Sequence, residues 1–358
     1  MDSSGIDRRT VLLGSAAGVA ALAGCIDAIG GDGGNSGDGL PSYTQLVTPG
    51  ETGESLAVYL DLAAASGLEG IDPSQGDEGG SATEDGLLGI PAVGFFFLAF
   101  GQLPLATAGL DVLVEDAEPF SSDTKGEQSE DGPAFDTELT DELLVTQGLI
   151  LRGDIDTDEI AEILTTTPDD GGFSQKQAFE QVDTTDELEI YESVEGTEQV
   201  VGVGGSTIFV TETTDELEQL IGAQNGEQTR TAETSEPFEW VNTEVSGGYL
   251  RLTLWGDNGV DESSAGGDES SPQRGELIDE ELFEAVGTTV AVASTLAGDS
   301  GETQVDLALV VDGELTDEAQ STLEDELGAT ADDIEFEFDG DRLLVSGTYS
   351  EPEDGLPA

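Results

Sequence analysis

The residues LLVTQGLILRGD, from Leu143 to Asp154, are followed at once by IDTDEIAEIL, and a similar order returns as TQVDLALVV, from Thr303 to Val311, followed by LTDEA from Leu315. Each first run is rich in apolar and β-branched residues, which is typical of a strand. Each second run carries acidic residues in what would be the first turn of a helix. We therefore predict a strand and then a helix at both places.

The same scheme extends outward from both places. A strand that leads into an acidic loop is expected at Ser55 to Leu62 and again at Tyr249 to Trp255. A hairpin is expected after each helix, with strands at 187–193 and 200–211 in the first copy, and at 333–338 and 342–349 in the second. We predict an α+β fold of two tandem units of mainly antiparallel sheet, with helices packed on one face.

Two further helices complete the scheme. The letters TTDELE occur at 184–189, before a predicted strand, and at 213–218, where they open a predicted helix from Thr214 to Ile221. Residues Glu276 to Val286 have the period of an amphipathic helix. In the repeat they take the place that Gly86 to Leu110 takes in the first copy.

The segment from Gly86 to Leu110 has no charged residue over 25 positions. That length would allow a membrane span, but Pro91 and Pro104 would kink a helix, and acidic rather than basic residues flank both ends. A buried core helix is the favoured interpretation. A segment that touches a membrane or a partner, and a true span, remain the alternatives.

The N-terminus has the layout of a cleavable export signal. Arg8 and Arg9 precede an uncharged, mostly apolar stretch that closes on Leu22-Ala23-Gly24-Cys25. These four residues resemble the lipobox of bacterial and archaeal lipoproteins. The resemblance implies that the chain is cut before Cys25, that the Cys25 sulfur carries a lipid, and that the protein is held on the outer side of the cell membrane.

These observations divide the chain into four segments. Residues 1–24 are the expected twin-arginine signal peptide, and residues 25–53 a lipid-anchored flexible tether rich in Gly, Asp, Asn and Ser. The two α+β units are expected at 54–235 and 236–358. Three acidic stretches rich in Gly and Ser are expected to be loops: 72–86, 121–132 and 256–275.

The charge is extreme, with 79 acidic residues against 9 basic ones and a net charge of −70. This balance resembles that of proteins from halophilic archaea that keep molar salt inside the cell. Such a surface lacks the Lys and Arg that bind phosphate groups, so nucleic acid is excluded as a partner. The membrane is an expected partner, reached through the lipid on Cys25, and a protein or small-molecule partner is not identified.

The composition also excludes familiar catalytic chemistry. The chain has no histidine, and Cys25 is its only cysteine, so His-dependent triads, His-ligated or thiolate metal sites and intramolecular disulfides are all excluded. We name no catalytic residue, no cofactor and no metal ligand.

Several short motifs have ordinary structural interpretations. Ser122 to Lys125 matches S-x-x-K but lies in an acidic loop, Gly202 to Thr207 has the letters of a phosphate loop without its lysine, and Asp154 to Asp158 imitates a calcium loop without its glycine and glutamate. We expect a chance match, a turn and a helix cap, respectively. Arg152, Arg251 and Arg342 fall in predicted strands, where ion pairs with carboxylates are expected.

The sequence thus predicts a non-catalytic surface lipoprotein that acts as a binding or envelope-associated module of unknown ligand. One alternative is a solute-capture lipoprotein of a transporter, which would need two α/β lobes around a cleft. The other is a carboxylate-dependent extracellular hydrolase, which would need two acids converging in a deep pocket.

Overall fold

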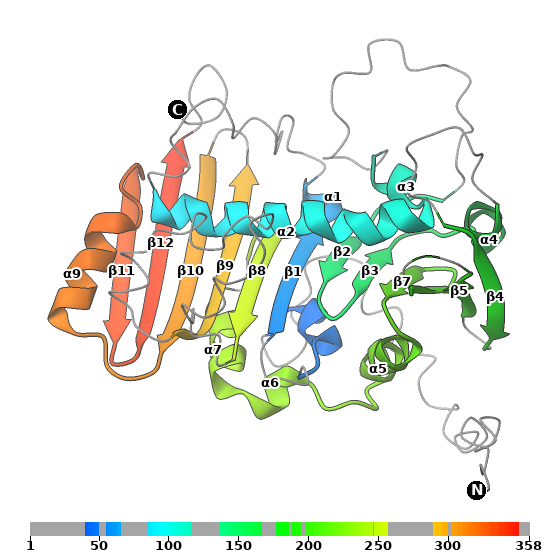
Figure 1. Cartoon of the computed structure of the whole chain (residues 1–358). Coiled ribbons are helices and arrows are strands. Elements are labelled where there is room, and N and C mark those ends of the chain that lie inside the picture. The colour runs from blue at the N-terminus through cyan, green and yellow to red at the C-terminus, as the bar shows by residue number, and fades with distance from the viewer. Residues whose placement is uncertain are drawn as a thin grey trace, which may run out of the picture.

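The chain folds around a single twelve-stranded antiparallel sheet with the order β11-β12-β10-β9-β8-β1-β2-β3-β7-β6-β5-β4 (Figure 1). The structure is a computed structural model that describes residues 40–49, 55–65, 85–115, 137–166, 177–185, 188–194, 196, 198–245, 247–256, 289–299 and 302–350. The strands are β1 Ser55–Asp61, β2 Glu142–Val145, β3 Leu149–Arg152, β4 Phe179–Thr184, β5 Glu189–Ser193, β6 Val200–Val203, β7 Thr207–Thr211, β8 Leu250–Trp255, β9 Thr289–Asp299, β10 Glu302–Val311, β11 Asp333–Asp339 and β12 Arg342–Ser350. The predicted α+β class is confirmed.

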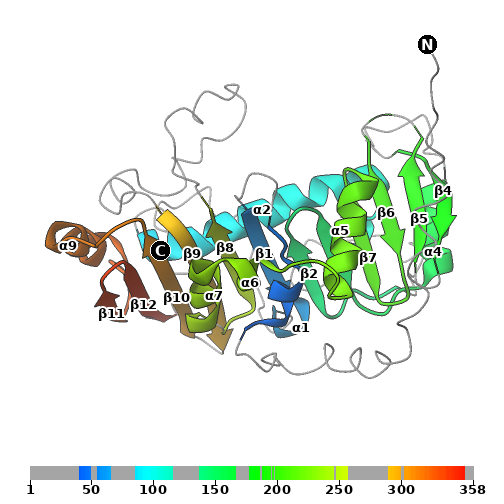
Figure 2. The ribbon, with the colours of Figure 1, turned by 90° about the horizontal axis from the view of Figure 1, so that it is seen from below.

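Helices cover both faces of this sheet, as Figure 2 shows from below. They are the 3-10 helix η3 Ser42–Leu46, α1 Leu62–Ala65, α2 Gly86–Ala108, α3 Asp111–Glu115, α4 Thr157–Thr165, α5 Thr214–Gln224, α6 Thr231–Thr234, α7 Glu236–Glu244 and α9 Asp317–Glu326. Helix α2 lies on one face, which we call the α2 face. Helices α5, α6 and α7 lie on the other, which we call the α7 face.

The prediction that helices pack on one face is therefore corrected, and strand β1 gives the reason. Successive side chains of a strand point to opposite faces, and in β1 both sets are apolar. Val58 and Leu60 belong to the core of the α2 face, whereas Ala57 and Tyr59 belong to the core of the α7 face. A sheet that is apolar on both faces must be covered on both.

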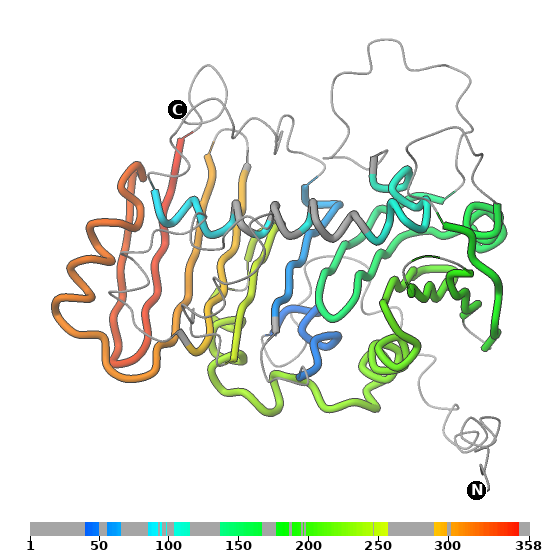
Figure 3. Tube along the Cα trace, in the orientation of Figure 1, coloured from blue at the N-terminus to red at the C-terminus, as the bar shows by residue number. Residues whose placement is uncertain are grey.

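The two predicted units contribute opposite halves of the one sheet (Figure 3). Strands β1 to β7 form one half, and β8 to β12 form the other. The halves join along the antiparallel ladder between β1 and β8, which runs from the Ser55–Trp255 pair to the Leu60–Leu250 pair. The boundary between 235 and 236 falls between α6 and α7, and the division into tandem units stays a prediction.

Most of the expected strands are present, with two corrections. The run from Leu143 to Asp154 is the hairpin β2–β3 rather than one strand, because Thr146 to Gly148 turn the chain back so that Leu143 pairs with Leu151. The run from 200 to 211 is likewise the hairpin β6–β7. Strands β4 and β9 were not predicted.

The predicted helix at Glu276 to Val286 and the three acidic loops, apart from Asp85, Gly86 and Gly256, lie outside the described residues.

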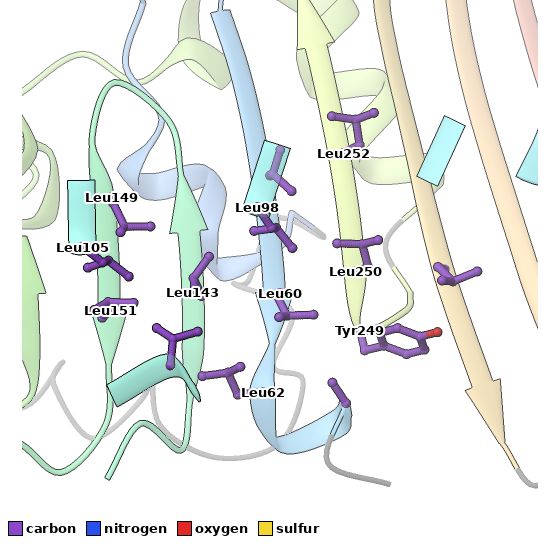
Figure 4. Packing of buried hydrophobic residues seen from close by; sticks show 14 of the residues in the cluster. Leu60, Leu62, Leu98, Leu105, Leu143, Leu149, Leu151, Tyr249, Leu250 and Leu252 are labelled. Carbon is purple, nitrogen blue, oxygen red and sulfur yellow. The ribbon is translucent and has the colours of Figure 1, made fainter. Parts of the chain in front are cut away.

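The uncharged segment from Gly86 forms helix α2, which lies across the middle of the sheet (Figure 1). Its described apolar side chains include Leu87, Leu98 and Leu105, which are at most 1% exposed. Figure 4 shows Leu98 and Leu105 among the leucines of β1, β2, β3 and β8. The core-helix interpretation is confirmed for these side chains.

Within the described part of the chain, no helix combines the length and the apolar character that crossing a membrane requires.

Candidate functional site

The predicted site residues Arg8, Arg9 and Cys25 lie outside the described residues, as does the motif from Ser122 to Lys125. The structure instead brings together a set of polar and aromatic side chains on the α7 face, at the point where the described chain begins. We call Tyr43, Tyr59, Asn242, Arg251 and Thr253 the Tyr43 cluster.

Three buried side chains form its hydrogen-bonded part. The Tyr43 hydroxyl donates to Oδ1 of Asn242 and lies 3.2 Å from Oγ1 of Thr253, which itself donates to the same Oδ1 at 3.1 Å. The Asn242 amide nitrogen donates to the carbonyl of Phe238 at 2.9 Å. These bonds connect η3 with α7 and β8, so three elements that are distant in sequence are fixed to one another.

The aromatic part places a cation against two rings. The rings of Tyr43 and Tyr59 stack with centroids 4.9 Å apart. The guanidinium carbon of Arg251 lies 5.8 Å from the Tyr43 centroid and 5.7 Å from the Tyr59 centroid, which is within the range of cation–π attraction. Burial raises the pKa of Tyr43, and burial together with the Glu142 carboxylate raises the pKa of Tyr59, so both phenols stay protonated at neutral pH.

A buried ion pair lies next to this cluster. Nη1 of Arg152 in β3 is 2.7 Å from Oε1 of Glu142 in β2, and their side chains are only 11% and 7% exposed. Burial raises the pKa of the Glu142 carboxyl, and the nearby Arg152 opposes that rise. Among the described residues, Nε of Arg152 has no hydrogen-bond partner, so the pair recovers only part of its desolvation cost.

The three strand arginines therefore have different partners. Ion pairs are confirmed for Arg152 and for Arg342, whose Nη2 lies 2.8 Å from Oε1 of Glu236. The Arg342 guanidinium also lies 4.8 Å from the ring centroid of Trp240. The Arg251 guanidinium lies against the stacked rings of Tyr43 and Tyr59, and its ion pair with a carboxylate stays a prediction.

The remaining motifs have the structural roles that were expected. The side chain of Asp156 accepts hydrogen bonds from the backbone of Asp158 and Glu159, so it caps α4. The segment from Gly202 to Thr207 is the turn of the hairpin β6–β7, closed by the bond from Gly204 N–H to the Thr207 carbonyl. Among the described residues, no group of three or more acidic or cysteine side chains is arranged to hold a metal ion.

The arrangement acts as an attachment point. Its polar groups bond to one another, and its cation lies against aromatic rings, so its chemistry fixes η3, at the start of the described chain, to the centre of the sheet. Tyr43 and Asn242 were not predicted from the sequence, because an isolated Tyr and an Asn within a helix carry no local signal. Asp85 was also missed, although an Asp just before an apolar run is a known cap signal.

We expect Tyr43→Phe to lower the free energy of unfolding by about 1–2 kcal/mol, because it removes one hydrogen bond to a buried amide oxygen. Chemical denaturation in molar salt measures this change. Tyr249→Phe is the matched control. Burial alone raises the pKa of Tyr249, with no contribution from a hydrogen bond or a neighbouring charge, so this variant removes a hydroxyl without removing a comparable bond. Equal losses in the two variants would show that the Tyr43 hydroxyl contributes nothing specific.

No protein-family model matches the chain, and no curated protein matches it. Among solved structures, crystal form I of TP0453 is similar at 13% identity with a TM-score of 0.40, over 86% of this chain and 92% of that chain. Crystal form III of TP0453 is similar at 11% identity with a TM-score of 0.36, over 86% of this chain and 93% of that chain. Scores this low say nothing about function.

Proposed function

We propose that the chain is a non-catalytic lipoprotein of a halophilic archaeon, held on the outer side of the cell membrane by a lipid on Cys25, with a body that acts as a binding or envelope-associated module. The observation that carries the proposal is the arginine pair Arg8-Arg9 followed by an apolar run that ends in Leu22-Ala23-Gly24-Cys25. Two signals of different kinds thus occur within 25 residues.

The attachment of η3 supports a body that is held by its N-terminus. The 14 residues from 26 to 39 separate Cys25 from Leu40, the first described residue. A chain of that length reaches at most about 50 Å. Beyond it, the Tyr43 cluster and the bond from Thr231 N–H to the Val47 carbonyl, at 3.0 Å, fix η3 to the fold. A pull on the lipid would therefore act on the centre of the sheet.

The sheet topology favours this proposal over a solute-capture lipoprotein. Proteins of that kind close two α/β lobes around a ligand. Here all described strands pair antiparallel in one sheet. A ligand cleft between parallel sheets would need a different topology.

The buried acids also disfavour the hydrolase. Among the described residues, Asp85 and Glu142 are the buried carboxylates, with exposures of 0% and 5%. Asp85 accepts hydrogen bonds from two backbone amides of one loop, and Glu142 is paired with Arg152. A catalytic pair needs two carboxyl groups that face one site and remain open to substrate.

The test is the location of Cys25→Ser in a halophilic host. We expect the native protein in the membrane fraction and the variant in the medium, because the lipid on Cys25 is the proposed attachment. Retention of the variant on the membrane would overturn the lipid anchor.

The matched control replaces the arginine pair with lysines. Arg8→Lys with Arg9→Lys should keep the uncleaved precursor inside the cell, since the pair is the proposed export signal. Normal export of this double variant would exclude the twin-arginine route while leaving the lipid on Cys25 open to the first test.

A further inference from the structure

Helix α2 contacts strands of both halves of the sheet. On one side of the β1–β8 junction it contacts β8, β9 and β10, and on the other side it contacts β1 and β2. At the crossing point Gly94 lies against Val58 and Leu252, where an added Cβ would be in ordinary contact at 3.6–3.7 Å. The helix is thus a strap across the two halves (Figure 1).

One end of the strap is held by a single carboxylate. Asp85 caps α2, and its Oδ1 accepts from the backbone N–H groups of Leu87, at 3.0 Å, and Gly328, at 2.9 Å. Its Oδ2 accepts from the N–H of Thr330 at 2.9 Å, from the Thr330 hydroxyl at 2.8 Å and from the Tyr349 hydroxyl at 3.3 Å. Four of these five bonds join α2 to the segment after α9 and to β12.

The other end is held by neutral groups. The Gln199 amide nitrogen donates to the Pro104 carbonyl at 2.8 Å, and the Thr107 hydroxyl donates to Oε1 of Gln199 at 2.8 Å. The N–H of Gln177 donates to the Thr107 carbonyl at 2.8 Å. These bonds join the end of α2 to the first half of the sheet, and none of them depends on a charge.

A proline separates the Asp85 end from the rest of the helix. Pro91 has no N–H, so the Leu87 carbonyl lacks the donor that would tie the first turn to the next. The first turn is packed tightly, since a Cβ on Gly347 would lie 2.7 Å from Cδ2 of Leu87. Pro104 removes the corresponding bond near the other end, so the two ends differ in the groups that hold them and not in helix continuity.

We propose that one end of α2 can detach from the sheet while the other end stays attached. The detachable end is Asp85 to Ile90, which we call the latch; it is held through the charge of Asp85, and it opens at Pro91. The end bound by Gln199 stays attached. The two oxygens of the Asp85 carboxylate are both acceptors, so the five donors share one side chain. An amide in its place would turn an N–H₂ group toward donors that have no other hydrogen-bond partner among the described residues. Opening uncovers the β12 surface beneath Leu87.

The test is hydrogen exchange, followed by mass spectrometry, on Asp85→Asn in molar salt. We expect exchange to become about tenfold faster or more in peptides that cover 85–90 and 328–330, because lost hydrogen bonds lower the free energy of local opening. Peptides that cover 104–108 and β1 should keep the native rate. Asp341→Asn, at an exposed carboxylate outside the latch, is the control and should change neither end.

Two results would overturn the latch. One is unchanged exchange at 85–90, and the other is equal acceleration at both ends of α2, which would mean that Asp85 only stabilises the fold as a whole. Should Asp85→Asn fail to fold, Thr330→Val removes one donor and keeps the backbone N–H. Exchange is then expected to be about threefold faster in the peptides that cover 85–90 and 328–330, and unchanged in those that cover 104–108. The absence of this difference would count against the proposal.

Discussion

Replacing Arg152 with methionine is expected to lower the free energy of unfolding by about 3–5 kcal/mol, because it leaves the Glu142 carboxylate buried without its cation. The two side chains lie 2.7 Å apart and are almost inaccessible to water. Methionine keeps much of the arginine's apolar length, so the change tests charge more than volume. Denaturant unfolding of both proteins in the same molar salt measures it.

The pH dependence of that loss identifies its cause. Without Arg152, burial and the nearby Asp141 and Asp61 carboxylates raise the pKa of the Glu142 carboxyl further above the ordinary value. In the window between the unfolded and folded pKa values, the folded state then binds more protons than the unfolded state, so stability rises as the pH falls. The deficit of Arg152→Met should shrink on moving from pH 7 toward the ordinary pKa of a glutamate, and a deficit that stays constant would exclude the buried charge as its cause.

The double variant Glu142→Leu with Arg152→Met is the control. Replacing a buried ion pair by apolar groups of similar volume is often neutral or stabilising. Since Nε of Arg152 has no hydrogen-bond partner among the described residues, little favourable interaction is lost with the pair. We expect the double variant to be more stable than Arg152→Met alone. Equal instability of the two would place the loss in packing.

Dialysis from molar salt into dilute buffer is expected to unfold the protein. The chain carries a net charge of −70. At about 1 M salt the Debye length is about 3 Å and neighbouring carboxylates are screened, whereas at about 0.01 M it is about 30 Å and they repel one another. Circular dichroism during stepwise dialysis should show loss of the sheet signal below a threshold of salt.

A neutral osmolyte separates charge screening from other effects of the solvent. Sucrose strengthens burial without screening charge, so it should not replace salt at low ionic strength. A sheet signal that persists in dilute buffer would contradict the interpretation of the charge as an adaptation to salt. Rescue by sucrose alone would attribute the effect of salt to burial.

The parts of the fold that the sequence predicts are those set by local period. Strand β8 and the hairpin β11–β12 were expected from alternation and from the Asp339-Gly340 turn, and α4 from its caps. Local sequence does not predict secondary structure where tertiary contacts determine it. TTDELE joins β4 to β5 at 184–189, yet at 213–218 it opens α5, where Thr213 and Glu216 form a capping box.

The arrangement of these elements could not be predicted for the same reason. Helices cover both faces of the sheet because its strands are apolar on both sides. An apolar run in the sequence does not say which segments pack against it. Four of the five bonds of Asp85 reach 243 residues or more along the chain, and those of Tyr43 reach 199 or more. No pattern within one segment encodes such a partner.

The N-terminal peptide of the mature protein, purified from membranes and analysed by mass spectrometry, tests the proposed anchor at the residue itself. We predict that the chain begins at Cys25 and that this residue carries the added mass of a lipid. A chain that begins elsewhere, or an unmodified Cys25, would contradict the account.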